Sequence, residues 1–434
     1  MNILLINTFI YVIAFIYFFR KKGVTIYTVL WFEFAIIAFL GYYTFEVGIY
    51  EYQFGPHRLS ELTLLPYIFV FLGHLIAFEP FRKLNPNLDT PIPYRKYTSV
   101  LLNLWIIAMT VYLILKISES IVTAAYGMGD YYNERSSEGV NLFDYSDNLW
   151  LKGINKIGDI LSTPIIPFVV AYCVQCWKRR EHTVKSLILI TLCFLPYVFG
   201  AAAGGSRTNL FFVLLNIMFF FLLYSKAISA KVRRIAVIIS VGFVAIMFSY
   251  AMTITEERFG EKYENNIDPI LRYFGEPFPN VGFQYYGKVK EHSWGLRRFG
   301  GIIDDREFRT SNEKRDYWTK KTGVSAYYFS TYWIDMYIEF SEIGAFIFVI
   351  LYALIIKKLT GPKLTVYNMS FLFLYFRQMA SGFRSLDWFG IGFVYTVVAM
   401  FIINFAIKKL YFSGNSSSVP KEQSIQRRQG TYSL

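Results

Sequence analysis

Residues 186–225 read SLILITLCFLPYVFGAAAGGSRTNLFFVLLNIMFFFLLYS, two apolar runs joined by a short turn at Gly204 to Thr208. Each run, 186–203 and 208–225, has close to the roughly 20 residues that an α-helix needs to cross a bilayer. A turn this short between two such runs predicts an antiparallel pair of membrane-spanning helices. It also places Arg207 at a membrane boundary.

The whole chain has the composition of a membrane protein. It has 434 residues, of which 54% are hydrophobic and 20% aromatic, and its mean hydropathy is +0.36. The first apolar run has no basic segment before it and no small-residue cleavage site, so we interpret it as a retained span and not as a signal peptide. The predicted spans are 2–19, 24–42, 61–78, 98–116, 154–176, 186–203, 208–225, 235–253, 337–356, 364–380 and 389–407. The predicted class is therefore an all-α, polytopic integral membrane protein with about 11 transmembrane helices.

Basic residues cluster in alternate connections between these spans. The clusters lie at 20–22, 79–97, 178–185, 226–234, 357–363 and from Lys408 onward, and together hold 23 basic but only four acidic residues. Because cytoplasmic loops carry the excess of lysine and arginine, this pattern predicts an outside N-terminus and a cytoplasmic C-terminus. The net charge of +13 is then a topology signal, which argues against a nucleic-acid-binding surface.

The predicted domain organisation is one membrane domain, residues 1–412, followed by a disordered cytoplasmic tail at 413–434. Two outer segments are long: 118–150, which is acidic, and 254–336, which lies between the eighth and ninth spans and is rich in charges and aromatics. A loop of the second length is usually functional, and we expect short helices in it, for example around Asn266 to Phe274.

Arginines on the predicted outer side are the first candidates for a binding site. Arg207 lies on the short turn, Arg377 and Arg384 flank another turn, and Arg135 and Arg272 lie in the two long segments. Guanidinium groups bind phosphate oxygens in a bidentate way and stay charged at any working pH. The alternative for each is a structural salt bridge, as it is for Arg297 and Arg298; no acid lies near Arg207 in the sequence.

Acid–base and sugar-binding candidates occur in the longer loop. His292 and Glu276 could each take a proton from an attacking hydroxyl, although a lone loop histidine can also be an ordinary surface residue. Tyr285, Tyr286 and Trp294 could offer ring faces to a sugar, or could belong to an interfacial aromatic belt. The sequence has no Asp-x-Asp motif, no phosphate-binding loop and no metal-ligand cluster, so we expect neither a metal nor another cofactor.

Glu33 lies in the middle of the second predicted span. An ionisable residue at that depth is a functional candidate, for example in a proton path. It could equally be a buried carboxylate bonded to tyrosines or to an arginine.

The chain resembles the Wzy-type oligosaccharide repeat-unit polymerases, which make O-antigen, capsule and enterobacterial common antigen. The resemblance rests on the turn Gly205-Ser-Arg207-Thr-Asn209, on the large outer loop before a late span, on Ala326-Tyr-Tyr-Phe-Ser-Thr with Phe340-Ser-Glu-Ile-Gly344, and on Arg384-Ser-Leu-Asp387. Such a polymerase works in the bacterial inner membrane and transfers a growing glycan from undecaprenyl pyrophosphate to a new lipid-linked repeat unit. A separate co-polymerase can regulate the chain length.

Applied to this chain, the resemblance implies a role for each group of candidates. Arg207 and Arg384 would stabilise the leaving pyrophosphate, and His292 or Glu276 would act as the base. The other arginines and the aromatic residues would bind substrate, and grooves between the spans would hold the lipid tails. The alternatives are an O-antigen ligase, which transfers a similar glycan to lipid A, a proton-coupled transporter of polysaccharide or lipid-linked substrates that uses Glu33, and a structural membrane scaffold.

Overall fold

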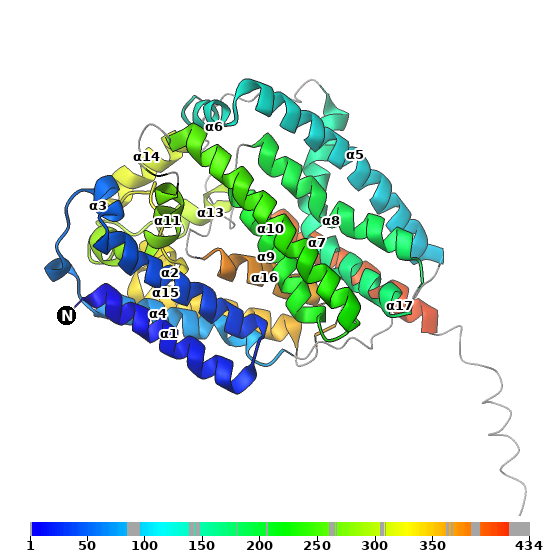
Figure 1. The fold of residues 1–434 in the computed structure, drawn as a ribbon, viewed down its shortest axis with the longest axis horizontal. Helices are drawn as coiled ribbons and strands as arrows, with labels where there is room; N and C mark the ends of the chain where they lie inside the picture. Colours follow the sequence, from blue (N-terminus) through cyan, green and yellow to red (C-terminus); the bar gives the residue numbers. More distant parts are fainter. Residues whose placement is uncertain are drawn as a thin grey trace, which may run out of the picture.

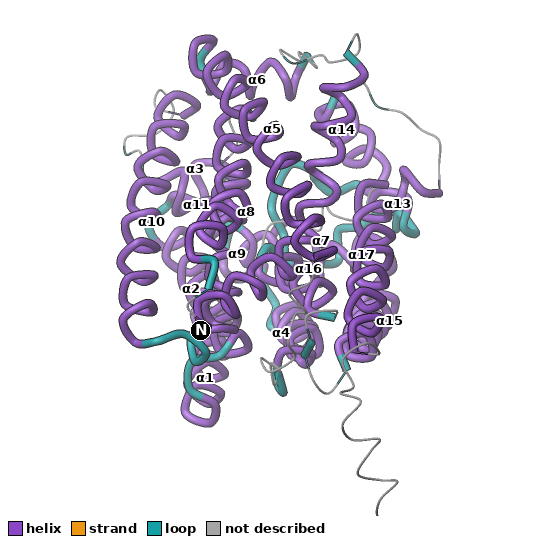
Figure 2. The backbone as a smooth tube through the Cα atoms, turned by 90° about the vertical axis from the view of Figure 1, so that its right-hand side faces the viewer, coloured by secondary structure: helices purple, strands orange, loops and turns teal. Residues whose placement is uncertain are grey.

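The computed structural model describes residues 2–84, 96–138, 143, 148–179, 181–204, 207–259, 265, 267–303, 308, 310–361, 364–365, 368–382 and 391–415. Within these ranges all regular secondary structure is helical, which confirms the predicted all-α class (Figures 1 and 2). The longer helices are α1 (Ile3–Lys22), α2 (Ile26–Glu46), α4 (Leu65–Phe78), α5 (Lys96–Tyr126), α7 (Leu149–Arg179), α8 (Thr183–Ala203), α9 (Arg207–Tyr224), α10 (Ala230–Phe259), α15 (Tyr332–Thr360), α16 (Met369–Ala380) and α17 (Ile391–Asn415). The shorter ones are α3 (Ile49–Phe54), α6 (Met128–Ser137), α11 (Asp268–Gly275), α12 (Pro277–Asn280), α13 (Leu296–Ile303) and α14 (Ser311–Thr322), with single turns at Leu59–Glu61, Glu79–Phe81 and Val281–Tyr285.

The first helix shows how the sequence sets helix boundaries. The Asn2 side chain caps α1 by accepting hydrogen bonds from the backbone amides of Leu4 and Leu5, at 3.0 and 3.3 Å. The helix ends at Gly23, whose φ of 64° a glycine adopts without strain. Its last turn consists of basic residues, which suit the negative end of the helix dipole.

Each of the eleven predicted spans coincides with one of the longer helices. Five of them, α1, α2, α5, α8 and α15, are long and apolar enough to cross a bilayer, and shorter apolar stretches lie at 65–81, 211–224 and 393–406. Many large apolar side chains on these helices are exposed, among them Ile13, Leu104 and Ile107 at 64%, 61% and 62%. This is the surface of a polytopic membrane protein; the number of crossings and their direction stay predictions.

The short helices α3, α6, α11, α13 and α14 lie towards one end of the bundle, at the upper left of Figure 1. We call this end the loop end. The N-terminus also lies on that side, whereas α17 runs away from it. The segments that the charge pattern places outside the membrane are therefore gathered at one end of the molecule.

Aromatic side chains fill the core between α1, α2 and α4. Tyr11, Trp31, Phe34 and Phe78 are all fully buried. The Tyr11 hydroxyl bonds to Nδ1 of the buried His74, at 2.6 Å. The high aromatic content of the sequence is thus used largely for packing inside the bundle.

Part of the predicted 254–336 loop is buried inside the bundle. Residues 275–281 form an unbroken buried run, and the Phe278 ring lies 5.2 Å from that of Tyr11 in α1. Helix α11 approaches α2 closely: a Cβ at Gly275 would lie only 2.7 Å from the Leu40 carbonyl oxygen. The segment therefore inserts between the long helices, although its charged and proline-rich sequence favours an exposed loop. A helix does occur where we expected one, at Asp268–Gly275.

Helix α15 is broken near its start. Ser341 has φ 64° and ψ −177°, a backbone conformation that is strained for a residue other than glycine. The break separates a buried first part, 332–340, from a second part that carries the apolar surface of the predicted span. The first part belongs to the loop end and supports the site residues described next.

Candidate functional site

The first turns of α9 form the centre of the candidate site. Arg207 opens this helix, so the turn singled out in the sequence does lead directly into a helix N-terminus. A helix N-terminus presents free amide groups and favours anions. The side chain of Arg207 and the whole of Arg384 lie outside the part of the chain that the structure describes.

Arg377 reaches α9 from α16. Its side chain is buried, with only 5% of the residue exposed, and its guanidinium carbon lies 5.1 Å from the centre of the Phe212 ring. A second ring, that of Phe373, lies at 5.9 Å. Stacking on two aromatic rings fixes the plane of the guanidinium group and stabilises its charge without neutralising it.

Arg272 and Glu276 lie on the inserted segment, which contacts α9 through Phe274. They are four residues apart on one helical face, with 3.3 Å between Arg272 Nε and Glu276 Oε2. Arg272 also donates a hydrogen bond to Gln53, at 2.7 Å. Two residues after Arg272, Phe274 packs against Phe211 of α9, with 5.8 Å between the ring centres.

Glu276 is a buried carboxyl group with a perturbed pKa. Burial raises its pKa from 4.5 to about 7, against the opposing effects of Arg272 and of the Phe329 amide. That amide donates to Glu276 Oε1 at 3.0 Å, so the carboxyl group is held from both sides. A carboxyl group that titrates near neutral pH is suited to proton transfer.

Arg135 approaches the same region from α6. It is exposed, and its Nη1 atom would lie 3.6 Å from a Cβ at Gly204, the residue that ends α8. Arg135 and Arg377 therefore lie near the end of α8 and the start of α9, and Arg272 lies with Glu276 at the C-terminal end of α11, whose Phe274 packs on α9. We call these three arginines, together with Glu276, the arginine group.

Tyr285 and Tyr286 follow the inserted segment and have different environments. Tyr285 is 1% exposed, and its hydroxyl lies 2.8 Å from the Tyr328 carbonyl oxygen and 3.2 Å from that of Ser325. It therefore supports the backbone next to the arginine group and offers no ring face to solvent. Tyr286 is partly buried and stacks on Tyr337 of α15, with 5.4 Å between the ring centres.

His292 and Trp294 lie on the far side of this region, beside the first part of α15. His292 Nδ1 is 3.4 Å from the Ile338 carbonyl oxygen, and its ring packs edge-on against Tyr337. Trp294 is 67% exposed, so its indole is open to a ligand. None of the described contacts of His292 reaches Glu276 or the arginines, so the structure does not bring the two base candidates together.

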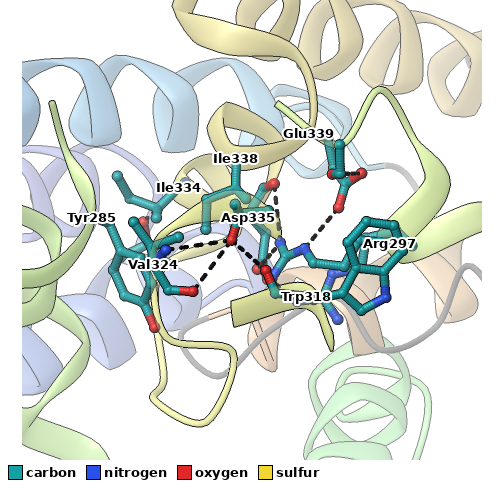
Figure 3. A network of polar contacts seen from close by, with 12 residues as sticks. Tyr285, Arg297, Trp318, Val324, Ile334, Asp335, Ile338 and Glu339 are labelled. Atoms are coloured by element: carbon teal, nitrogen blue, oxygen red, sulfur yellow. Dashed lines mark hydrogen bonds and ion pairs between the residues drawn. The ribbon is translucent and has the colours of Figure 1, made fainter. Parts of the chain in front are cut away.

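A network of buried ion pairs anchors the chain next to His292 (Figure 3). Arg297 bonds to Asp335 and to Glu339, at 2.9 Å each, and Arg298 bonds to Asp335 at 2.6 Å. Glu339 also accepts hydrogen bonds from the Ser293 hydroxyl and the Gly295 amide. These two arginines are thus engaged by carboxylates, as the salt-bridge alternative predicted, and are not available to a phosphate.

Sequence reasoning missed the carboxylates of this network and the amide partner of Arg272. Asp335 and Glu339 are four residues apart in an apolar stretch, so a helix there places both on one face. The adjacent pair Arg297-Arg298 carries the matching positive charge. That spacing was a readable signal. Nothing in the sequence points to Gln53, because it comes near Arg272 only through tertiary packing.

Comparisons with protein-family models, curated proteins and solved structures find no match to this chain. The site must therefore be interpreted from its own chemistry. Among the residues that the structure describes, no three His, Cys, Asp or Glu side chains come together as a metal site. The described residues offer two arginines near the N-terminus of α9 and, at the end of the neighbouring α11, an arginine paired with a carboxyl group whose pKa is raised to about 7.

Proposed function

We propose that this protein polymerises oligosaccharide repeat units that are linked to a lipid pyrophosphate, such as undecaprenyl pyrophosphate, at the outer face of a bacterial inner membrane. The observation that supports this most is the arginine group: three arginines and the buried Glu276, on three elements that each contact α8 or α9. One of the four features that carry the resemblance to Wzy-type polymerases is the turn that leads into α9.

The arrangement suits a pyrophosphate leaving group. Glycan transfer breaks the bond between the anomeric carbon and the pyrophosphate oxygen, so negative charge develops on that oxygen. The guanidinium of Arg377 lies against the rings of Phe212 and Phe373, and Arg135 lies beside Gly204, the C-cap of α8. Positive groups that are fixed before the reaction stabilise such a charge most effectively.

Glu276 is the better supported of the two base candidates. It lies in the arginine group, and its pKa of about 7 lets it accept a proton at neutral pH. His292 is held by a backbone carbonyl beside α15, next to the exposed Trp294. We assign Glu276 the role of base, and we assign the region of His292 and Trp294 to sugar binding.

The function is tested with purified full-length protein and a lipid-pyrophosphate-linked repeat unit, with and without EDTA, and the products are separated on a gel. The wild-type protein should give a ladder spaced by one repeat unit. Arg207→Ala should lower the transfer rate on the order of 10²–10³-fold, since it removes one electrostatic contact to the leaving group. The matched control is Arg58→Ala, which removes an exposed arginine at the loop end and should leave the ladder unchanged.

Other outcomes would replace the proposal. Transfer to added lipid A without a ladder would make the protein a ligase. Failure to transfer to either acceptor, with several repeat-unit chemistries, would exclude both enzymes and favour a transporter. A full ladder from Arg207→Ala would show that the pyrophosphate does not bind at the start of α9.

A further inference from the structure

A cavity of about 460 Å³ lies between α2, α9 and α10, and the Phe274 side chain of α11 also lines it. Its volume is within the range of roughly 300–1,000 Å³ that is typical of small-molecule sites. The walls are apolar, with Phe32, Leu215 and Val241 as examples. Glu33 is the only ionisable residue that the described lining contains, and Ser240 is the only one with a hydroxyl group.

Glu33 has no partner within this part of the protein. Both of its carboxylate oxygens are buried, and neither has a hydrogen-bond partner among the residues that the structure describes. The sequence left open whether Glu33 belongs to a proton path or is a buried carboxylate bonded to tyrosines or to an arginine. Such bonding is not observed among the described residues. A buried carboxylate without a partner is strongly disfavoured, so a compensating group is needed when it is charged.

The cavity opens to the outside of the bundle. Phe32, Val241 and Val244 line it and are also exposed on the lipid-facing surface, by 47%, 63% and 46%. A ligand can therefore enter from the bilayer without passing through the loop end. Phe212, the ring against which Arg377 lies, does not line this cavity, so the cavity is on a different face of α9.

The chemistry of the walls restricts the occupant. A divalent cation bound by one carboxylate would keep most of its waters, and the apolar walls cannot hydrogen-bond to them. A plain hydrocarbon chain would fill the walls, but it fits only the uncharged form of Glu33, since it cannot compensate a carboxylate. A single positive charge on an apolar body satisfies both the walls and the carboxylate.

We propose that this cavity binds a lipophilic monocation, with the positive charge beside the Glu33 carboxylate and the apolar body against α9 and α10. The glutamate side chain has three rotatable bonds, so the carboxylate can turn towards the ligand when it binds. This site is independent of the glycan chemistry proposed for the loop end.

The test uses the immobilised full-length protein and tritium-labelled tetraphenylphosphonium, a water-soluble lipophilic monocation, in a scintillation proximity assay. Binding to the wild-type protein should be saturable. Glu33→Gln keeps the side-chain shape and removes the charge, so it should weaken binding about 10- to 100-fold, the effect of losing a charged contact. Ser240→Ala, a neutral change in the same cavity, should alter binding by no more than about twofold, since it leaves that contact in place.

Two further measurements make the result decisive. Triphenylphosphine oxide has the same aryl groups without the charge, and it should compete at least tenfold more weakly than unlabelled tetraphenylphosphonium. If it competes equally, the cavity is a hydrocarbon site and the proposal is wrong. Absence of saturable binding in the wild type, or equal affinity in Glu33→Gln with an unchanged melting temperature, would also overturn it.

Discussion

The raised pKa of Glu276 makes a quantitative prediction about stability that does not depend on the reaction. The group titrates near 7 in the folded protein and near 4.5 in an unfolded chain. Between these values the folded state binds one more proton, so its stability falls as the pH rises. Integration between pH 5.5 and pH 8 gives a loss of about 2 kcal/mol from this one group, at 1.36 kcal/mol for each pKa unit.

Glu276→Gln removes the titrating carboxyl group, while the glutamine carbonyl oxygen can still accept the hydrogen bond from the Phe329 amide. The stability advantage of the wild-type protein over the variant should therefore shrink by about 2 kcal/mol between pH 5.5 and pH 8. The assay is unfolding by SDS in mixed micelles, followed by tryptophan fluorescence at several pH values. The matched control is Glu291→Gln: the Glu291 side chain is 60% exposed and lies 3.7 Å from Lys321, so the substitution should change the stability little.

The same variant tests the catalytic role. A base works in its deprotonated form, so wild-type transfer should rise with pH through about 7 and then level off, whereas Glu276→Gln should be slower by about 10²–10⁴-fold. A stability difference that is flat between pH 5.5 and pH 8 would refute the assigned titration. A variant with normal transfer and the expected stability profile would refute only the role as base.

Three further substitutions test the packing and the charges. Asp335→Asn leaves its two buried arginines undercompensated and should lower the free energy of unfolding by about 3–5 kcal/mol; a loss below 1 kcal/mol would contradict the buried network. Gly275→Ala places a Cβ 2.7 Å from a backbone oxygen of α2 and should cost about 1–3 kcal/mol, whereas Gly242→Ala, with no atom within 4 Å, should not destabilise. Arg377→Lys loses the planar stacking on Phe212 and should lower transfer in the gel assay by about 10²-fold or more; wild-type rates would show that charge alone is sufficient.

The positions of the long helices were predictable because they depend on local chemistry. Runs of about 20 apolar residues must satisfy their backbone hydrogen bonds internally, and a helix does this. Every predicted span has a helix for this reason. Helix α7 even contains two prolines, Pro164 and Pro167, in its interior. The i,i+4 ion pair of Arg272 and Glu276 is local in the same sense.

The insertion of residues 275–281 was not predictable from local chemistry. Its prolines and its glutamate favour an exposed turn, but the close approach of Gly275 to α2 and the contact of Phe278 with Tyr11 bury it. Both contacts join residues that are more than 200 positions apart in the chain. The raised pKa of Glu276 follows from that burial, so the most informative property of the site is a consequence of tertiary packing.

The carboxyl groups of Asp335 and Glu339, of Glu276 and of Glu33 differ in how far their charge is compensated. Asp335 and Glu339 share two arginine partners and accept several hydrogen bonds. This arrangement holds two segments together and leaves little negative charge uncompensated. Glu276 has one arginine and one amide, so its carboxyl group remains close to the point of binding a proton.

Glu33 has no described partner at all. A buried charge is retained only where something compensates it, so the decreasing compensation from Asp335 and Glu339 through Glu276 to Glu33 corresponds to three roles. We interpret full compensation as a structural anchor, partial compensation as a group that can move a proton, and a missing partner as a site that a ligand completes.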